Sequence, residues 1–259
     1  MSPPVAWKVA GAGRPLVFLH GVGGGAESFD AQLSHFGDRG WRACAWDMPG
    51  YGASPGLATP GFDAWADALD AGLDALGATD CVLVGHSIGG MVAQGYVARQ
   101  PGRVRALVLS ATSPAFGNPD GDFQRAFIAE RLGPLDRGAT MADLAEAFVP
   151  GLVGSAAAPE SIAAARATMA RVPTATYRAA MEALVRFDAR GTLAGIACPC
   201  LLIAGAEDAA APPRVMERMA GRMRDARLVV LPGAGHLSNI EQPHAFNTAL
   251  AGFLDTLDG

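Results

Sequence analysis

Short apolar runs alternate along the chain with longer stretches in which apolar residues recur at helical spacing. The runs predict seven strands, at residues 5–9, 16–20, 42–46, 81–84, 104–110, 200–204 and 227–231. The inner runs are apolar at almost every position, which is typical of parallel strands covered by helices on both faces. The longer stretches predict helices at residues 26–39, 62–76, 88–99, 213–223 and 243–257. This alternation predicts an α/β protein with a doubly wound, mostly parallel sheet.

The alternation stops between residues 114 and 193, where no convincing strand is found. Apolar side chains recur there at helical spacing, as at Phe123 and Phe127. We therefore expect residues 1–113 and 194–259 to form one core, with residues 114–193 inserted into it as a helical cap. A length of 259 residues is enough for one such domain with a sizeable core.

The composition limits which partners and which location we expect. Half of the residues are hydrophobic, 17% are charged, and the formal net charge is −5. The acidic balance and the lack of a basic cluster argue against a nucleic-acid partner. No apolar run reaches the roughly 18 residues of a membrane helix, and residues 1–4 show no secretory-signal features. We expect a cytoplasmic protein with no membrane partner, whereas the sequence does not indicate its oligomeric state.

The four cysteines give no sign of a metal or redox site. Cys44 and Cys81 lie in strand-like apolar runs, so we expect them to be buried as small hydrophobic side chains. Cys198 and Cys200 are separated by one proline, and no second Cys or His pair lies nearby to complete a zinc site. We therefore expect no bound metal.

Residues 85–89 form the most specific motif, Gly-His-Ser-Ile-Gly. An apolar run predicted to be a strand precedes it, and a predicted helix follows. A strand that turns sharply into a helix through a serine presents that serine at the edge of the sheet, and small neighbours allow the strained turn. In this setting the motif resembles the nucleophile elbow of the α/β-hydrolase family, which makes Ser87 the candidate nucleophile.

A serine nucleophile needs a base in contact with it and a carboxylate that orients the base. The resemblance implies that these follow in the order Ser, then Asp or Glu, then His. Asp208 follows the sixth predicted strand, with Glu207 beside it as the alternative acid. His236 follows the last predicted strand in a glycine-containing loop. We therefore predict a catalytic triad of Ser87, Asp208 and His236.

The resemblance also implies an oxyanion hole made of two backbone N–H groups. One belongs to Ile88, directly after the serine and at the start of its helix. The other belongs to Val22, in a His-Gly-Val-Gly-Gly-Gly stretch at residues 20–25 that resembles the family's His-Gly-x loop. A phosphate-binding loop is the alternative reading of these glycines. It fails because neither Gly-x-x-x-x-Gly-Lys-Ser/Thr nor a helix-opening Gly-x-Gly-x-x-Gly is present.

Three further features concern the loops and strands around the predicted triad. The turn at residues 47–54 resembles the family's Asp-x-Pro-Gly-x-Gly-x-Ser turn, in which we expect Asp47 to accept bonds from backbone N–H groups. His20 and His86 flank the site, and we interpret them as residues that orient loops. Family members usually begin with two antiparallel strands, but only residues 5–9 fit here, so we expect the first strand to be absent or very short.

The resemblance implies a serine hydrolase that cleaves a carboxylic ester or a lactone through an acyl-enzyme, similar to 3-oxoadipate enol-lactonases and carboxylesterases. No cofactor is implied, and the expected partner is a small, partly apolar acyl substrate. The alternatives are a meta-cleavage C–C hydrolase, a cofactor-free perhydrolase or oxygenase, or a ligand receptor of this fold. The aromatic residues of the cap fit either an apolar pocket or an ordinary cap core. They include Phe116, Phe123, Phe127, Phe148 and Tyr177.

Overall fold

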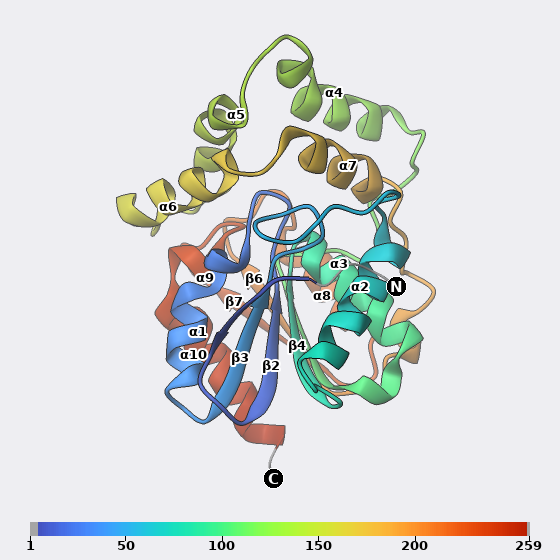
Figure 1. The fold of residues 1–259 in the computed structure, drawn as a ribbon, viewed down its shortest axis with the longest axis vertical. Helices are drawn as coiled ribbons and strands as arrows, with labels where there is room; N and C mark the ends of the chain where they lie inside the picture. Colours follow the sequence, from blue (N-terminus) through green and yellow to red (C-terminus); the bar gives the residue numbers. More distant parts are fainter. Residues whose placement is uncertain (1–4, 258–259) are drawn as a thin grey trace.

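A seven-stranded sheet lies at the centre of the computed structural model, which describes residues 5–257 (Figure 1). Residues 1–4, in which we noted no secretory-signal features, lie outside this part, as do residues 258–259. The strand order is β1-β3-β2-β4-β5-β6-β7. The strands are β1 (Trp7–Ala10), β2 (Arg14–Leu19), β3 (Trp41–Trp46), β4 (Cys81–His86), β5 (Val104–Ser110), β6 (Cys200–Gly205) and β7 (Ala226–Leu231).

Every neighbouring pair of strands is parallel except β1 and β3, which pair antiparallel at one edge. All six residues of β4 are buried, because helices cover both faces of the sheet. The predicted fold class is therefore confirmed, and all seven predicted strands form. Within the described residues a single antiparallel strand, β1, precedes β2, in line with the short N-terminal start that we expected.

Helices on the two faces of the sheet bury two separate apolar clusters. α2 (Phe62–Ala75), α3 (Ile88–Arg99) and α8 (Pro213–Ala220) pack on one face, and α1 (Asp30–Gly37) and α10 (Pro243–Leu254) pack on the other. The helix predicted at residues 26–39 differs from expectation. It begins as a 3₁₀ turn, Ala26–Phe29, because Phe29 has φ −113° and ψ 18°, outside the α-helical range.

Four helices fill the chain between β5 and β6 and lie above the sheet in Figure 1. Two backbone bonds close the base of this segment, which we call the cap. Phe116 N–H donates to Phe187 O (3.1 Å), and Ala189 N–H donates to Pro114 O (2.7 Å). The helices are α4 (Asp122–Asp136), α5 (Met141–Phe148), α6 (Pro159–Ala170) and α7 (Thr174–Leu184).

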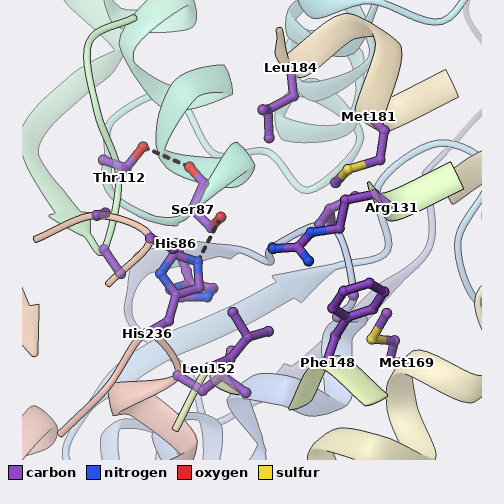
Figure 2. A pocket seen from close by; sticks show the side chains of 18 of the residues that line it. His86, Ser87, Thr112, Arg131, Phe148, Leu152, Met169, Met181, Leu184 and His236 are labelled. Carbon is purple, nitrogen blue, oxygen red and sulfur yellow. Dashed lines mark hydrogen bonds between the residues drawn. The ribbon is translucent and has the colours of Figure 1, made fainter. Parts of the chain in front are cut away.

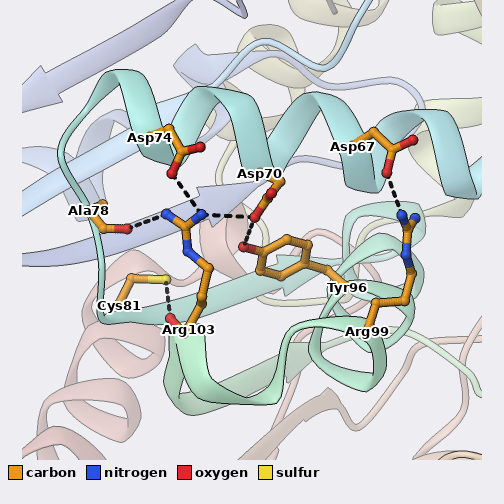
Figure 3. Close-up of polar contacts among 8 residues, drawn as sticks. All are labelled: Asp67, Asp70, Asp74, Ala78, Cys81, Tyr96, Arg99 and Arg103. Carbon is orange, nitrogen blue, oxygen red and sulfur yellow. Dashed lines mark hydrogen bonds and ion pairs between the residues drawn. The ribbon is translucent and has the colours of Figure 1, made fainter.

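A polar network ties α2 to α3 and to the turn that follows it (Figure 3). Asp70 Oδ1 accepts a bond from the buried Tyr96 hydroxyl (2.7 Å) and another from Arg103 Nη1 (2.9 Å). Arg103 also contacts Asp74 (2.8 Å) and the carbonyl of Ala78 (2.9 Å). These contacts anchor the C-terminal end of α3, the end that lies away from Ser87.

The described residues also bear on the cysteines and on membrane insertion. Cys44 and Cys81 are buried in strands, as predicted. Within residues 5–257, no three His, Cys, Asp or Glu side chains come together in an arrangement that could hold a metal ion. None of the helices in this range is long and apolar enough to cross a membrane.

Candidate active site

Ser87 lies on a tight turn between β4 and α3. Its φ of 54° and ψ of −121° are strained for a residue with a side chain. The turn has no room for larger neighbours, since a Cβ atom on Gly85 would lie 2.5 Å from the Cα of Gly90, and one on Gly89 would lie 2.3 Å from Leu19 O. The backbone at Ser87 therefore has the shape that the Gly-x-Ser-x-Gly motif predicts.

The structure brings Ser87, His236 and Asp208 into one chain of hydrogen bonds (Figure 2 shows the first two). Ser87 Oγ lies 3.1 Å from His236 Nε2, and His236 Nδ1 lies 2.9 Å from Asp208 Oδ2. The other oxygen of Asp208 accepts bonds from the N–H groups of Ala210 (2.8 Å) and Ala211 (2.9 Å). With Nδ1 donating to Asp208, Nε2 is free to accept the serine proton.

The surroundings of Asp208 keep it ionised. Burial alone would raise its pKa, but the charge of His236, their shared hydrogen bond and the two backbone N–H donors outweigh burial and lower the pKa. The alternative acid, Glu207, lies at the surface and accepts bonds from the N–H (2.7 Å) and hydroxyl (2.6 Å) of Ser155. The structure therefore brings Asp208, and not Glu207, to the histidine.

The two predicted oxyanion donors have no hydrogen-bond partner among the described residues. The N–H of Ile88 is at the first position of α3, where no preceding turn of the helix can accept it. The loop of Val22 is held by Tyr51, whose hydroxyl donates to Val22 O (3.0 Å). Both N–H groups are therefore unpaired within the described chain, and their role as oxyanion donors stays a prediction.

His20 orients this loop, as predicted. Its Nδ1 donates to Gly21 O (2.8 Å), and its Nε2 accepts from the N–H of Met48 (3.0 Å). Such a pairing requires the neutral ring, and burial lowers the pKa of His20 accordingly. Asp47 also acts as predicted, since its carboxylate accepts from the N–H groups of Ala26 (2.9 Å) and Ala53 (3.1 Å).

His86 is buried beside His236. The centres of the His86 and His236 rings are 5.1 Å apart. Burial, followed by the charge of His236, lowers the pKa of His86 to about 3. Its Nδ1 is buried with no hydrogen-bond partner within the described chain. His86 therefore remains neutral at physiological pH and fills space next to Gly21, where an added Cβ would lie 2.9 Å from the ring.

Glu241 organises the loop of His236, a role that no motif in the sequence indicates. This buried carboxylate accepts three backbone N–H groups, from Gly154 (2.7 Å), Gly235 (2.8 Å) and Leu237 (2.8 Å). Gly154 belongs to the cap and the other two flank His236, whose own N–H donates to the carbonyl of Leu152 in the cap (2.7 Å). Glu241 therefore joins the cap to the loop that carries His236.

A cavity of about 540 Å³ extends from Ser87 and His236 into the cap. Its walls are mainly apolar, and Figure 2 shows Met181 and Leu184 on one side and Leu152, Phe148 and Met169 on the other. Such a cavity is of the size and character that bind small organic molecules. The aromatic residues singled out in the cap all line it: Phe116, Phe123, Phe127, Phe148 and Tyr177.

Comparisons with known proteins agree with this geometry. The model of the alpha/beta hydrolase family matches residues 16–249. A pimeloyl-(acyl-carrier protein) methyl ester esterase from Chromobacterium violaceum is 34% identical over 257 residues, covering 96% of this chain and 97% of that protein.

Two solved structures are similar over nearly the whole chain. An esterase from Thermogutta terrifontis with bound malate has a TM-score of 0.89 and 28% identity, covering 98% of this chain and 93% of its own. An enol-lactonase from Burkholderia xenovorans LB400 has a TM-score of 0.83 and 25% identity, covering 97% of this chain and 96% of its own.

Proposed function

Because the chain belongs to the α/β-hydrolase family, we propose that it hydrolyses a carboxylic ester or lactone through an acyl intermediate on Ser87. Esterases and a lactonase among its relatives support a hydrolase that acts on ester bonds. The observation that carries the finer proposal is the hydrogen-bond chain from Ser87 Oγ through His236 to Asp208. Ser87 and His236 line a cavity that has room for an acyl group.

In the first half of the reaction, Ser87 Oγ attacks the carbonyl carbon while His236 Nε2 takes its proton. The negative charge that develops on the carbonyl oxygen is met by the N–H groups of Val22 and Ile88, and one such donor contributes about 3–4 kcal/mol. Asp208 stabilises the protonated His236. The carbon–oxygen bond to the leaving group then breaks, His236 returns the proton to the departing alkoxide, and the acyl group stays on Ser87.

In the second half, a water molecule gives a proton to His236 and its oxygen attacks the acyl carbon. The bond to Ser87 Oγ breaks, the serine regains a proton from His236, and the acid is released. For a lactone the alcohol stays attached to the acid, so the product is a hydroxy acid. The substrate that fits this site is a small, partly apolar acyl compound, because most of the cavity wall is apolar. The cytoplasmic location stays a prediction from the sequence.

The nucleophile is tested by covalent labelling and by turnover. A fluorophosphonate probe is expected to label Ser87, and short p-nitrophenyl esters are expected to be cleaved. Ser87→Ala should abolish both, because among the described residues Ser87 is the only one whose hydroxyl bonds His236. Ester cleavage that persists in Ser87→Ala would contradict the assignment, provided that circular dichroism shows the variant to be folded.

The acid is tested by a matched pair of neighbouring carboxylates. Asp208→Asn should lower kcat by up to about 10⁴-fold, because the amide cannot hold His236 in the required tautomer. Glu207→Gln is the control, since Glu207 contacts Ser155 and not the histidine. A larger loss of kcat in Glu207→Gln than in Asp208→Asn would show that the acid is misassigned.

A further inference from the structure

Arg131 brings a positive charge into the apolar cavity. It lies on α4, and Figure 2 shows its guanidinium pointing into the space in front of Ser87 and His236. The guanidinium carbon lies 4.2 Å from the centre of the Phe148 ring and 5.1 Å from that of Phe127. Stacking on aromatic faces holds an arginine in place while leaving its N–H edge open.

Within the described residues, Arg131 forms one ion pair, with Glu130. Among the described residues its only hydrogen-bond acceptor is Oε1 of Glu130 (3.1 Å), a carboxylate that is itself 63% exposed to solvent. A guanidinium has five N–H donors, so most of them remain available. Arg178, another cap arginine, differs because it pairs with Asp136 and does not line the cavity. Arg131 and Glu130 are the only lining residues of the described chain with a permanent charge.

Tyr177 offers a second donor in the same part of the cavity. It lines the wall, and its hydroxyl has no hydrogen-bond partner among the described residues. Burial raises its pKa to about 12, against the opposing effect of the positive charge of Arg131. The phenol is therefore protonated at neutral pH and close enough to Arg131 to feel its charge.

We propose that Arg131 binds a carboxylate on the substrate, remote from the bond that is cleaved. The preferred substrates are then esters or lactones that carry a free carboxylate, such as monoesters of dicarboxylic acids. The planar fork of a guanidinium matches the two oxygens of a carboxylate, and the apolar wall between Arg131 and Ser87 suits a hydrocarbon chain. The reaction in this inference rests on the proposed function, whereas the binding can be tested separately.

The kinetic test compares charged and neutral substrates of the same length. Monomethyl esters of the dicarboxylic acids from succinate to suberate are paired with the corresponding methyl alkanoates. Wild-type protein should show a kcat/KM at least about 10-fold higher for the best charged ester than for its neutral partner. In Arg131→Gln this preference should fall by about 10- to 100-fold, mainly through KM, the range typical of hydrogen bonds to a charged group.

Two variants separate charge recognition from structural support. Arg131→Lys should restore part of the preference, because it keeps the charge but loses the fork and the stacking. Arg178→Gln is the matched control and should leave the preference unchanged, since this arginine lies outside the cavity. An equal loss of kcat/KM for charged and neutral esters in Arg131→Gln would overturn the proposal. If Arg131→Gln does not fold, the wild-type preference and the Lys variant decide the outcome.

A binding measurement distinguishes failure of this inference from failure of the proposed function. In Ser87→Ala, calorimetry should show that the best charged monoester binds about 10- to 100-fold more tightly than its neutral partner, and that Arg131→Gln removes the difference. Equal binding of the two ligands overturns the inference, even if wild-type protein hydrolyses esters. Arg131-dependent binding without turnover in the wild type supports it and contradicts the proposed reaction.

Discussion

Replacing Glu241 by alanine should lower the stability of the protein and disturb the position of His236. The carboxylate is 5% exposed and accepts N–H groups from Gly154, Gly235 and Leu237. Alanine leaves these three donors without their acceptor, in a part of the chain that has little access to water. The loop of His236 also loses one of its polar contacts with the cap, while the bond from its own N–H to Leu152 O remains.

The loss of unfolding free energy in Glu241→Ala follows from these three hydrogen bonds. Hydrogen bonds to a charged group contribute about 1.5–3 kcal/mol each, but water entering the vacated space and the removal of a buried charge offset part of the sum. We expect Glu241→Ala to lower the free energy of unfolding by about 3–5 kcal/mol, which corresponds to a fall in Tm of about 6–20 °C. Glu241→Gln retains one acceptor oxygen and should lose about 1–2 kcal/mol. Because a shift of about 1 Å at His236 can cost about 10²-fold in rate, kcat should fall at least 10-fold in the alanine variant.

Urea unfolding and cleavage of p-nitrophenyl acetate measure these two effects. Glu207→Ala is the control, because this neighbouring carboxylate also contacts the cap, through Ser155, but lies in solvent. It should leave the unfolding midpoint and kcat nearly unchanged. Glu241 does not hold the His236 loop in place if Glu241→Ala is no less stable than Glu207→Ala, or if it keeps wild-type kcat while stability falls.

Three further predictions concern the frame of the site. The pKa of His86 is about 3 in the folded protein, against an ordinary value of 6.5 in the unfolded chain. As the pH falls from 6.5 towards 3, only the unfolded state takes up this proton, so the stability of the folded protein decreases over that range. His86→Phe should reduce the difference in unfolding free energy between pH 7 and pH 4.5 by about 2–3 kcal/mol, measured in urea. Asp70→Ala should lower that free energy by about 1–3 kcal/mol, since it leaves the buried hydroxyl of Tyr96 unpaired, with kcat unchanged. Gly89→Ala should lower the free energy of unfolding by about 3 kcal/mol, because the added Cβ clashes with backbone atoms. Gly95→Ala on the same helix has no atom within 4 Å of the added Cβ and should raise that free energy by about 0.5–1 kcal/mol. A similar Tm for the two variants would contradict this prediction.

Much of the core was predictable because its signals are local in the sequence. A run such as Val104–Ser110 is apolar at most positions, and the strand has the same bounds in the structure. Ser87, Asp208 and His236 each follow a strand, so a parallel sheet brings them to the same edge without any knowledge of the loops between them.

The contacts that could not be predicted join segments far apart in the chain. Glu241 binds Gly154, 87 residues away, and it does so through a backbone N–H group that carries no side-chain signal. Arg131 looks like the other cap arginines in sequence, and its position in the cavity depends on how α4 packs beside Phe148 of α5. The cap therefore remained the least predictable part, since its helices have no sheet to fix their register.

The narrow base of the cap has a consequence for the exchange of modules between related proteins. Ala115 and Asp188 form a bridge there, so the two ends of the inserted segment lie side by side while β5 and β6 pair directly beneath them. A cap of different length could be grafted at this point without spreading the sheet. The graft would still have to supply a counterpart of Gly154, where a Cβ would lie 2.3 Å from Gly233 O. A cap exchanged at its base must therefore carry a glycine at the position of Gly154, so that the loop of His236 keeps its place.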